Sequence, residues 1–346
     1  MMWLCHPISL LSVVVATASA LPQPSDEAVQ RDPPSAVVGG GITCPAMFLP
    51  VGDQCLYFGT FMLTDQKGSA QICSSVAPGA HLVSIRTPTQ MKKIISEIIK
   101  KQYDSLGFWI DGTTDGGGVW NFTSGDLLPM GMPFWAASET IKYPVDDPNF
   151  KCAAITHDSG FYIENVDCTD RLSPICEAQP TAVDLEGGHT DVDGGAEIVS
   201  VNAACPPFYI NLEGTPICTA FAIWASVSWS DARQICEGLQ GELFTGMNIE
   251  YYRMIYDYLH QEGIDTFSFW IGGSKDEEGK WIWSDGLPVP KAAPFWGLSD
   301  TPEHILEPDG DGEGCLAMTA EGEYYFRDKQ CSAHYSPLCA AMALDP

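Results

Sequence analysis

Two stretches of the chain have the hydrophobic spacing of an amphipathic helix, with apolar residues at i, i+3, i+4, i+7 and i+8. The first set is Met91, Ile94, Ile95, Ile98 and Ile99. The second set is Tyr251, Met254, Ile255, Tyr258 and Leu259. Such a stripe is typical of a helix that buries one face against a core. The two stretches therefore predict two helices that pack in the same way.

Four lysines make the first of these helices basic, namely Lys92, Lys93, Lys100 and Lys101. A basic amphipathic helix is also typical of a segment that lies on a membrane surface. The second stripe has the same spacing without the lysines. Burial against a core is therefore the interpretation that fits both.

Each striped helix is preceded by a shorter predicted helix and followed by short apolar strands. The shorter helices are expected over residues 65–76 and 230–238, each with one cysteine facing inward. Strands are expected at 107–110 and 280–284, followed by long stretches rich in glycine, proline and aspartate. The pattern predicts an α+β fold with much of the chain in loops.

The similarity between these two groups of elements extends to the cysteines. Five cysteine pairs repeat at an offset of 163 residues: 55 and 218, 73 and 236, 152 and 315, 168 and 331, 176 and 339. Cys44 and Cys205 lie 161 apart, as do the Phe-Trp-Ile segments at 108–110 and 269–271. A fixed period of this size predicts a tandem duplication in which each copy is a domain with its own core.

The remaining segments predict an exported chain with two flexible connections. Residues 1–20 combine an apolar run with a small-residue Ala-x-Ala end, which is typical of a secretory signal. A transmembrane anchor is the alternative, but the run is too short to span a bilayer. Residues 21–43 and 178–204 are expected to form a leader and an acidic, glycine-rich linker that do not pack. We expect a secreted, extracellular protein.

Cysteine content agrees with export. Thirteen cysteines are present, and Cys5 would leave with the signal peptide, so twelve remain as two sets of six. An even set in an exported chain predicts disulfides. Zinc binding is the alternative, but the chain has neither C-x-x-C pairs nor nearby His-x-His spacings.

The chain has a net charge of −28. Residues 44–177 carry 15 acidic against 9 basic residues, a net of −6, whereas residues 205–346 carry 22 against 7, a net of −15. Such a field disfavours nucleic acid and anionic membranes, so neither is an expected partner. It favours cations, although a solvated acidic surface that keeps the chain soluble explains most of the excess.

The motifs in both copies resemble the long form of the C-type lectin-like domain. FWIDG and FWIGG stand where that family has its core WIGL motif, and Ser-Pro-Ile-Cys176 and Ser-Pro-Leu-Cys339 match its last cysteine. The resemblance covers residues 44–177 and 205–340. Taken together, the copies are similar to secreted two-domain lectins of invertebrates, arthropods in particular.

This resemblance implies a disulfide pairing, which six cysteines alone leave open. The implied pairs are Cys44–Cys55, Cys73–Cys176, Cys152–Cys168, Cys205–Cys218, Cys236–Cys339 and Cys315–Cys331. An enzyme is not expected, since the seven histidines are scattered along the chain. The chain contains neither a G-x-S-x-G nor an H-E-x-x-H motif.

In this family, sugar binding requires a calcium ion held by a Glu-Pro-Asn or Gln-Pro-Asp triplet, an acid before the third-last cysteine and an Asn-Asp pair. The second copy offers Glu307, Asp309, Glu313 and Asp328 at these places. Hard cations prefer six to eight oxygen ligands, so these carboxylates suit calcium. An EF-hand is excluded, since Ala320 occupies the position of its twelfth ligand.

The second copy departs from the pattern at Arg327, which replaces the asparagine of the Asn-Asp pair. Its guanidinium is expected either to neutralise Glu307 or Asp309 or to turn outward. The first copy departs further, with Phe150 in place of the acid. Its candidate ligand residues are Asp147, Asn149, Glu164 and Asn165. Calcium is therefore expected in the second copy and left open in the first.

The resemblance implies calcium-dependent binding of carbohydrate, with microbial surface glycans in innate immunity as the expected target. A calcium-independent adaptor that binds a protein partner is the alternative, favoured by Arg327 and Phe150. The sequon at Asn121 predicts N-glycosylation, with an unused sequon in a strand as the alternative. The identity of the sugar and the oligomeric state stay open.

Overall fold

The computed structural model describes residues 37–39, 42–182 and 205–343, except 213–214, 216, 247, 292–293, 302–305 and 311. The chain from Ala36 onward forms one compact unit. We call residues 42–182 the first half and residues 205–343 the second half. The predicted signal peptide, most of the leader and most of the linker lie outside the described residues.

The first half contains two helices, α1 (Gln66–Val76) and α2 (Pro88–Lys100). Helix α1 begins after Asp65, whose carboxylate accepts a hydrogen bond from the Gly68 N–H at 2.6 Å. Helix α2 begins after Thr87, which forms a capping box with Gln90. Four members of the predicted stripe are buried, and Ile99 is 48% exposed. The predicted helices of this half are confirmed.

The second half contains α3 (Trp229–Gly238) and α4 (Ile249–Gln261). Both helices were predicted, but the buried face of α4 differs from the predicted stripe. Its buried residues are Ile249, Tyr252, Ile255, Tyr256 and Leu259. The face is rotated because Tyr252 enters a cluster of aromatic rings, with its ring centroid 4.9 Å from that of Phe326. Among the described residues, no helix is long and apolar enough to cross a membrane.

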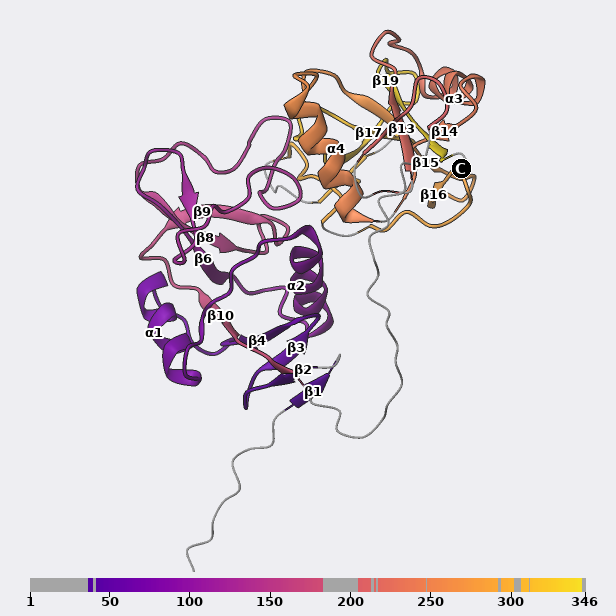
Figure 1. Ribbon diagram of the computed structural model, residues 1–346. Coiled ribbons are helices and arrows are strands. Elements are labelled where there is room, and N and C mark those ends of the chain that lie inside the picture. Colours follow the sequence, from indigo (N-terminus) through magenta and orange to yellow (C-terminus); the bar gives the residue numbers. More distant parts are fainter. Residues whose placement is uncertain are drawn as a thin grey trace, which may run out of the picture. The chain divides into compact units, whose positions relative to one another are not determined.

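Each half is built on one sheet of eight strands, and the two sheets have equivalent strand orders. In the first half the order is β3 (Leu49–Val51), β4 (Gln54–Phe58), β10 (Ser173–Ala178), β6 (Phe108–Thr114), β8 (Phe150–Ile155) and β9 (Ile163–Asp167). Strand β5 (His81–Leu82) pairs with β10, and β7 (Trp120–Asn121) pairs with β6. Figure 1 shows β6, β8 and β9 side by side. This arrangement confirms a mixed α+β fold with long loops.

The sheet of the second half repeats this order. It runs β12 (Ile210–Asn211), β13 (Ile217–Phe221), β19 (Ser336–Met342), β15 (Phe269–Lys275), β17 (Cys315–Met318) and β18 (Phe326–Lys329). Strand β14 (Glu242–Leu243) pairs with β19, and β16 (Trp281–Trp283) pairs with β15. The shared order is the structural counterpart of the sequence repeat.

A small third sheet corrects one prediction. Strand β2 (Ile42–Cys44) pairs with β1 (Val37–Gly39) on one side and with β11 (Thr181–Ala182) on the other. These strands belong to the segments 21–43 and 178–204, which were predicted not to pack. The prediction was wrong at these positions because backbone pairing needs no apolar pattern.

Six disulfides join the pairs that the resemblance implied. Cys73–Cys176 and Cys236–Cys339 each close a sequence separation of 103 residues and tie the first helix of each half to its sheet. Cys152–Cys168 and Cys315–Cys331 each close a separation of 16. In the chain-entropy model the long loops contribute about 4–5 kcal/mol each and the short ones about 3 kcal/mol.

The pairing predicts that the protein from residue 21 onward has no free thiol. A thiol assay on the denatured, unreduced protein should therefore detect none, and reduction should unfold both halves because each loses three cross-links. Detection of two or more thiols per chain would contradict the pairing. The same assay after reduction should detect twelve and serves as the control.

Candidate functional site

Strand β18 carries two charged residues at its centre, Arg327 and Asp328. In the antiparallel pairing with β17, they stand opposite Ala317 and Leu316. Side chains alternate between the faces of a sheet, so the two charged groups point to opposite sides. The Cys315–Cys331 disulfide fixes the ends of this hairpin. Both charged residues are buried, at 0% and 1% exposure.

Asp328 is the buried residue of this strand whose side chain has no hydrogen-bond partner. Both of its carboxylate oxygens are buried, and neither has a hydrogen-bond partner. Its carboxylate lies with those of Glu307 and Asp309 so that one oxygen from each falls within 4.8 Å of the others. A buried carboxylate without a partner is costly, since it has lost its hydration. The group therefore favours a cation at this position.

The loop at 307–310 shapes the other side of this cluster. Glu307 is 7% exposed, and its Oε2 accepts a hydrogen bond from the Asp309 N–H at 3.0 Å. A cis peptide precedes Pro308. Gly310 passes so close to the carboxylates that a Cβ there would lie 2.8 Å from Asp328 Oδ2 and 3.1 Å from Glu313 Oε2. A side chain at 310 would therefore displace the acidic groups.

Glu313 borders the cluster without belonging to it. Its carboxylate is outside the group of three, although it faces Asp328 across Gly310. Burial raises its pKa, and the Lys329 ammonium acts in the opposite direction. The structure thus brings together three of the four predicted ligands and leaves the fourth at the edge.

Arg327 follows the first of its two expected orientations. Its Nη1 donates to Glu307 Oε1 at 3.0 Å, while no contact with Asp309 is present. Its Nη2 donates to the backbone oxygen of Ala137 at 3.4 Å, and the Glu139 carboxylate lies 4.0 Å from its Nε. The guanidinium therefore reaches Glu307 from the face of β18 opposite to that of Asp328.

The pKa of Glu307 is raised by its burial and by the neighbouring carboxyl groups. Burial raises this pKa to about 8, although the Asp309 N–H acts in the opposite direction. The Asp328 carboxyl raises it further, and Arg327 lowers it. The shift comes mainly from burial, which disfavours the charged form of the carboxyl.

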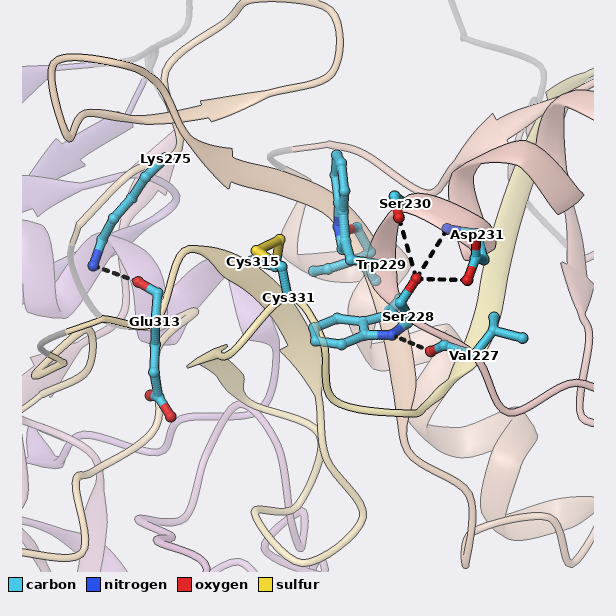
Figure 2. The surroundings of a disulfide bond; sticks show 11 residues. Val227, Ser228, Trp229, Ser230, Asp231, Lys275, Glu313, Cys315 and Cys331 are labelled. Atoms are coloured by element: carbon cyan, nitrogen blue, oxygen red, sulfur yellow. Dashed lines mark hydrogen bonds between the residues drawn. A yellow bond between two sulfur atoms is a disulfide. The ribbon is translucent and has the colours of Figure 1, made fainter.

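Lys275 is a second cation that the sequence did not identify as part of the site. Its Nζ donates to the backbone oxygens of Glu313 at 2.6 Å and Gly310 at 3.2 Å. It also lies 3.6 Å from Asp328 Oδ2. Figure 2 shows the ammonium at the Glu313 carbonyl, with the Glu313 carboxylate pointing the other way. No sequence motif marks this lysine, because its role depends on the approach of the 310–313 loop to β15.

The donor set fits calcium. Three carboxylates converge, one of them buried without a hydrogen-bond partner, and all their donor atoms are oxygens, as a hard cation prefers. Of the cationic residues beside them, Lys275 donates to the backbone oxygen of Glu313, and Arg327 donates to one carboxylate oxygen of Glu307. They reduce the negative charge of the cluster without filling its centre.

The first half arranges its predicted residues differently. Asn165, at the position of Asp328, accepts a hydrogen bond from the Val145 N–H at 2.8 Å and donates to the oxygens of Val145 and Phe150. Asp147 accepts hydrogen bonds from Asn149. Glu164 accepts a hydrogen bond from Thr156 instead of facing this loop, and burial raises its pKa. These four residues do not form one site.

The predicted sequon lies in a strand, as its alternative interpretation required. Asn121 is half-buried in β7, and the Thr123 hydroxyl donates to the buried Asp111 carboxylate at 2.7 Å. Glycosylation at Asn121 stays a prediction.

Comparison with known proteins places a C-type lectin domain in the second half. Residues 225–341 match the family model described as "Lectin C-type domain". A curated relative, the type-2 ice-structuring protein of Hemitripterus americanus, is 28% identical over 116 residues. The match covers 33% of this chain and 63% of that protein, so the chain spans less than two thirds of the relative.

Solved structures with similarity to the chain include both sugar-bound and calcium-independent members. The carbohydrate-recognition domain of cow CD23, solved in the presence of a GlcNAc2Man3 oligosaccharide, is 27% identical with a TM-score of 0.32. A calcium-independent type II antifreeze protein is 25% identical with a TM-score of 0.33. Each match covers 41% of this chain, and 99% and 96% of the other chain respectively.

The buried pair predicts a large effect at Arg327. Arg327→Met keeps a long side chain but leaves the buried Glu307 carboxyl and the Ala137 backbone oxygen without their donor, so the free energy of unfolding should fall by about 1–3 kcal/mol. Denaturant unfolding in calcium-free buffer measures this. Arg233→Met is the control, since Arg233 pairs with Glu237 on the surface and should cost at most about 1 kcal/mol. Equal losses in the two variants would contradict the assignment.

Proposed function

We propose that the C-type lectin domain of the second half binds calcium and, through the ion, carbohydrate. The observation that carries this proposal is the Asp328 carboxylate, which is buried without a hydrogen-bond partner and converges with Glu307 and Asp309. A calcium ion among these oxygens would compensate their mutual repulsion. It would supply the coordination positions that the vicinal hydroxyls of a sugar complete.

In this proposal the residues have distinct roles. Asp328 anchors the ion from the rigid β18, and Glu307 and Asp309 hold it from the loop. Glu313 completes the set when its carboxylate turns across Gly310. Asp309 is exposed, so it also faces the sugar. The chain then offers fewer oxygens than calcium accepts, which leaves room for two hydroxyls.

The first half is proposed to bind no calcium by itself. Asn165 has neutral partners for its amide, and Phe150 provides no oxygen ligand from its side chain. The ligand of the whole protein is proposed to be carbohydrate on glycoconjugates, with microbial surfaces as the biological target in the extracellular space.

A calcium-independent role is the second candidate, in which the loops bind a protein partner. One observation favours it, the Lys275 ammonium 3.6 Å from Asp328 Oδ2. If that ammonium satisfies the cluster, the loop is held without a metal. A calcium-independent antifreeze protein is among the similar structures. Calcium dependence of binding to a sugar resin separates the two candidates.

Asp328→Asn tests the calcium site directly. The substitution removes one charge from the centre of the cluster, so calcium affinity measured by calorimetry should fall at least tenfold, with loss of calcium-dependent retention on a sugar resin. Asp147→Asn, a matched charge removal in the first half, should leave both unchanged. A wild-type protein that shows no heat with calcium would refute the proposal.

Lys275→Met distinguishes the candidate functions by the sign of its effect. If calcium occupies the cluster, loss of the nearby ammonium should tighten calcium about three- to tenfold, because one repulsive charge is removed. If Lys275 replaces the metal, the variant should instead show a lower melting temperature with no response to calcium. A melting comparison with and without calcium measures both. Lys280→Met is the control, since Lys280 is exposed and pairs with the exposed Glu278.

A further inference from the structure

The two halves contact one another through equivalent residues. The Tyr162 hydroxyl donates to the backbone oxygen of Trp296 at 2.6 Å, and the Tyr325 hydroxyl donates to that of Trp135 at 2.7 Å. The two tyrosine rings lie against each other with centroids 4.8 Å apart. Both tyrosines are fully buried. Each half therefore uses the same residues to contact the other, as the two subunits of a two-fold symmetric dimer do. Here the two partners belong to one chain.

A short segment of the first half then reaches the loop that leads to the acidic cluster. The backbone oxygen of Ala137 accepts a hydrogen bond from the Leu298 N–H at 2.9 Å. Thr140 donates to Asp300 Oδ1 from its N–H at 3.0 Å and from its hydroxyl at 2.9 Å. The Glu307 N–H in turn donates to the Gly297 oxygen at 2.9 Å. The loop that carries Glu307 therefore rests on the first half.

The most informative residue of this segment is Glu139. Its Oε1 lies 2.9 Å from Lys329 Nζ and 4.0 Å from Arg327 Nε. These two cations are the residues on either side of Asp328. The Thr319 hydroxyl also donates to the same oxygen at 3.3 Å. One carboxylate of the first half thus faces both positive charges that flank the centre of the site.

We propose that the first half balances these charges and, through Glu139, holds the Lys329 ammonium away from the carboxylates of the site. Arg327 has two further carboxylates, Glu307 Oε1 at 3.0 Å and Asp300 Oδ2 at 4.0 Å, so the main partner of Glu139 is Lys329. Without Glu139, Lys329 is left beside Glu313, because the N–H of Gly314 donates to the Lys329 oxygen at 3.2 Å. The Lys329 ammonium would then compete with a metal ion for the Glu313 oxygens. In this view the first half is a structural part of the site, although it contributes no ligand.

The part of the proposal that concerns calcium rests on the proposed function, so its test has one arm without calcium. In the full chain with EDTA, a double-mutant cycle combines Glu139→Gln with Lys329→Met. Because the two side chains form one ion pair, the double variant should shift the denaturation midpoint by less than the sum of the single shifts. Additive shifts would overturn the proposal whether or not calcium binds.

The second arm measures calcium affinity by calorimetry. Glu139→Gln keeps the shape and an acceptor oxygen, so the fold is retained, yet calcium should bind about five- to tenfold more weakly. Asp158→Asn removes the same charge from a side chain of the first half that is 97% exposed, and it should change the affinity less than about twofold. Glu139→Asp retains the charge and should keep most of the affinity.

The outcomes separate the two hypotheses. If wild type binds calcium and Glu139→Gln leaves the affinity unchanged, the positioning role is wrong and the proposed function stands. If wild type binds no calcium but the midpoint shifts are non-additive, the proposed function is wrong and the charge balance by the first half stands. If Glu139→Asp weakens calcium as much as Glu139→Gln, charge is not the cause and the proposal fails.

Discussion

The buried guanidinium of Arg327 is the charge around which the second half is organised. It lies fully buried between the Glu307 carboxylate and the backbone of the first half. A buried charge is tolerated when its partners are fixed, and each partner here comes from a different segment of the chain. The loop at 307–310, strand β18 and the segment around Ala137 therefore have to be in place together.

This requirement explains why Asp328 can stay without a hydrogen-bond partner. If Arg327 paired with Asp328, the guanidinium would balance the charge of that carboxylate, and a bound cation would not be needed there. The alternation of side chains along β18 sends the guanidinium to the other side of the sheet. The carboxylate is then left facing two further acids. The register of the hairpin thus keeps the guanidinium away from Asp328, while Glu307 belongs both to the ion pair and to the acidic cluster.

Most of the fold was predictable from the sequence, because the repeat and the apolar stripes are local signals. The helices and their inward-facing Cys73 and Cys236 followed from spacing alone. The buried face of α4 did not, since Tyr252 packs against rings from Phe244 and Phe295 that lie elsewhere in the chain. Strand β11 was also missed, because its pairing with β2 depends on backbone groups that leave no pattern in the side chains.

The candidate site was predictable only in its acidic members. Glu307, Asp309 and Asp328 stand at positions where the family resemblance placed ligands, and the structure brings their oxygens together. The cations around them were harder to place. Lys275 comes from β15, and Glu139, which faces Arg327, comes from the other half. Charge balance at a site is a property of the folded surroundings, so motif spacing does not encode it.

The contrast between Asn165 and Asp328 gives a physical reason for the different roles of the halves. An amide carries both donors and an acceptor, so Asn165 satisfies itself against the backbone of Val145 and Phe150. A carboxylate only accepts, and Asp328 has no donor nearby that bonds to it. The side chain of Asn165 is therefore satisfied by the backbone of its own half.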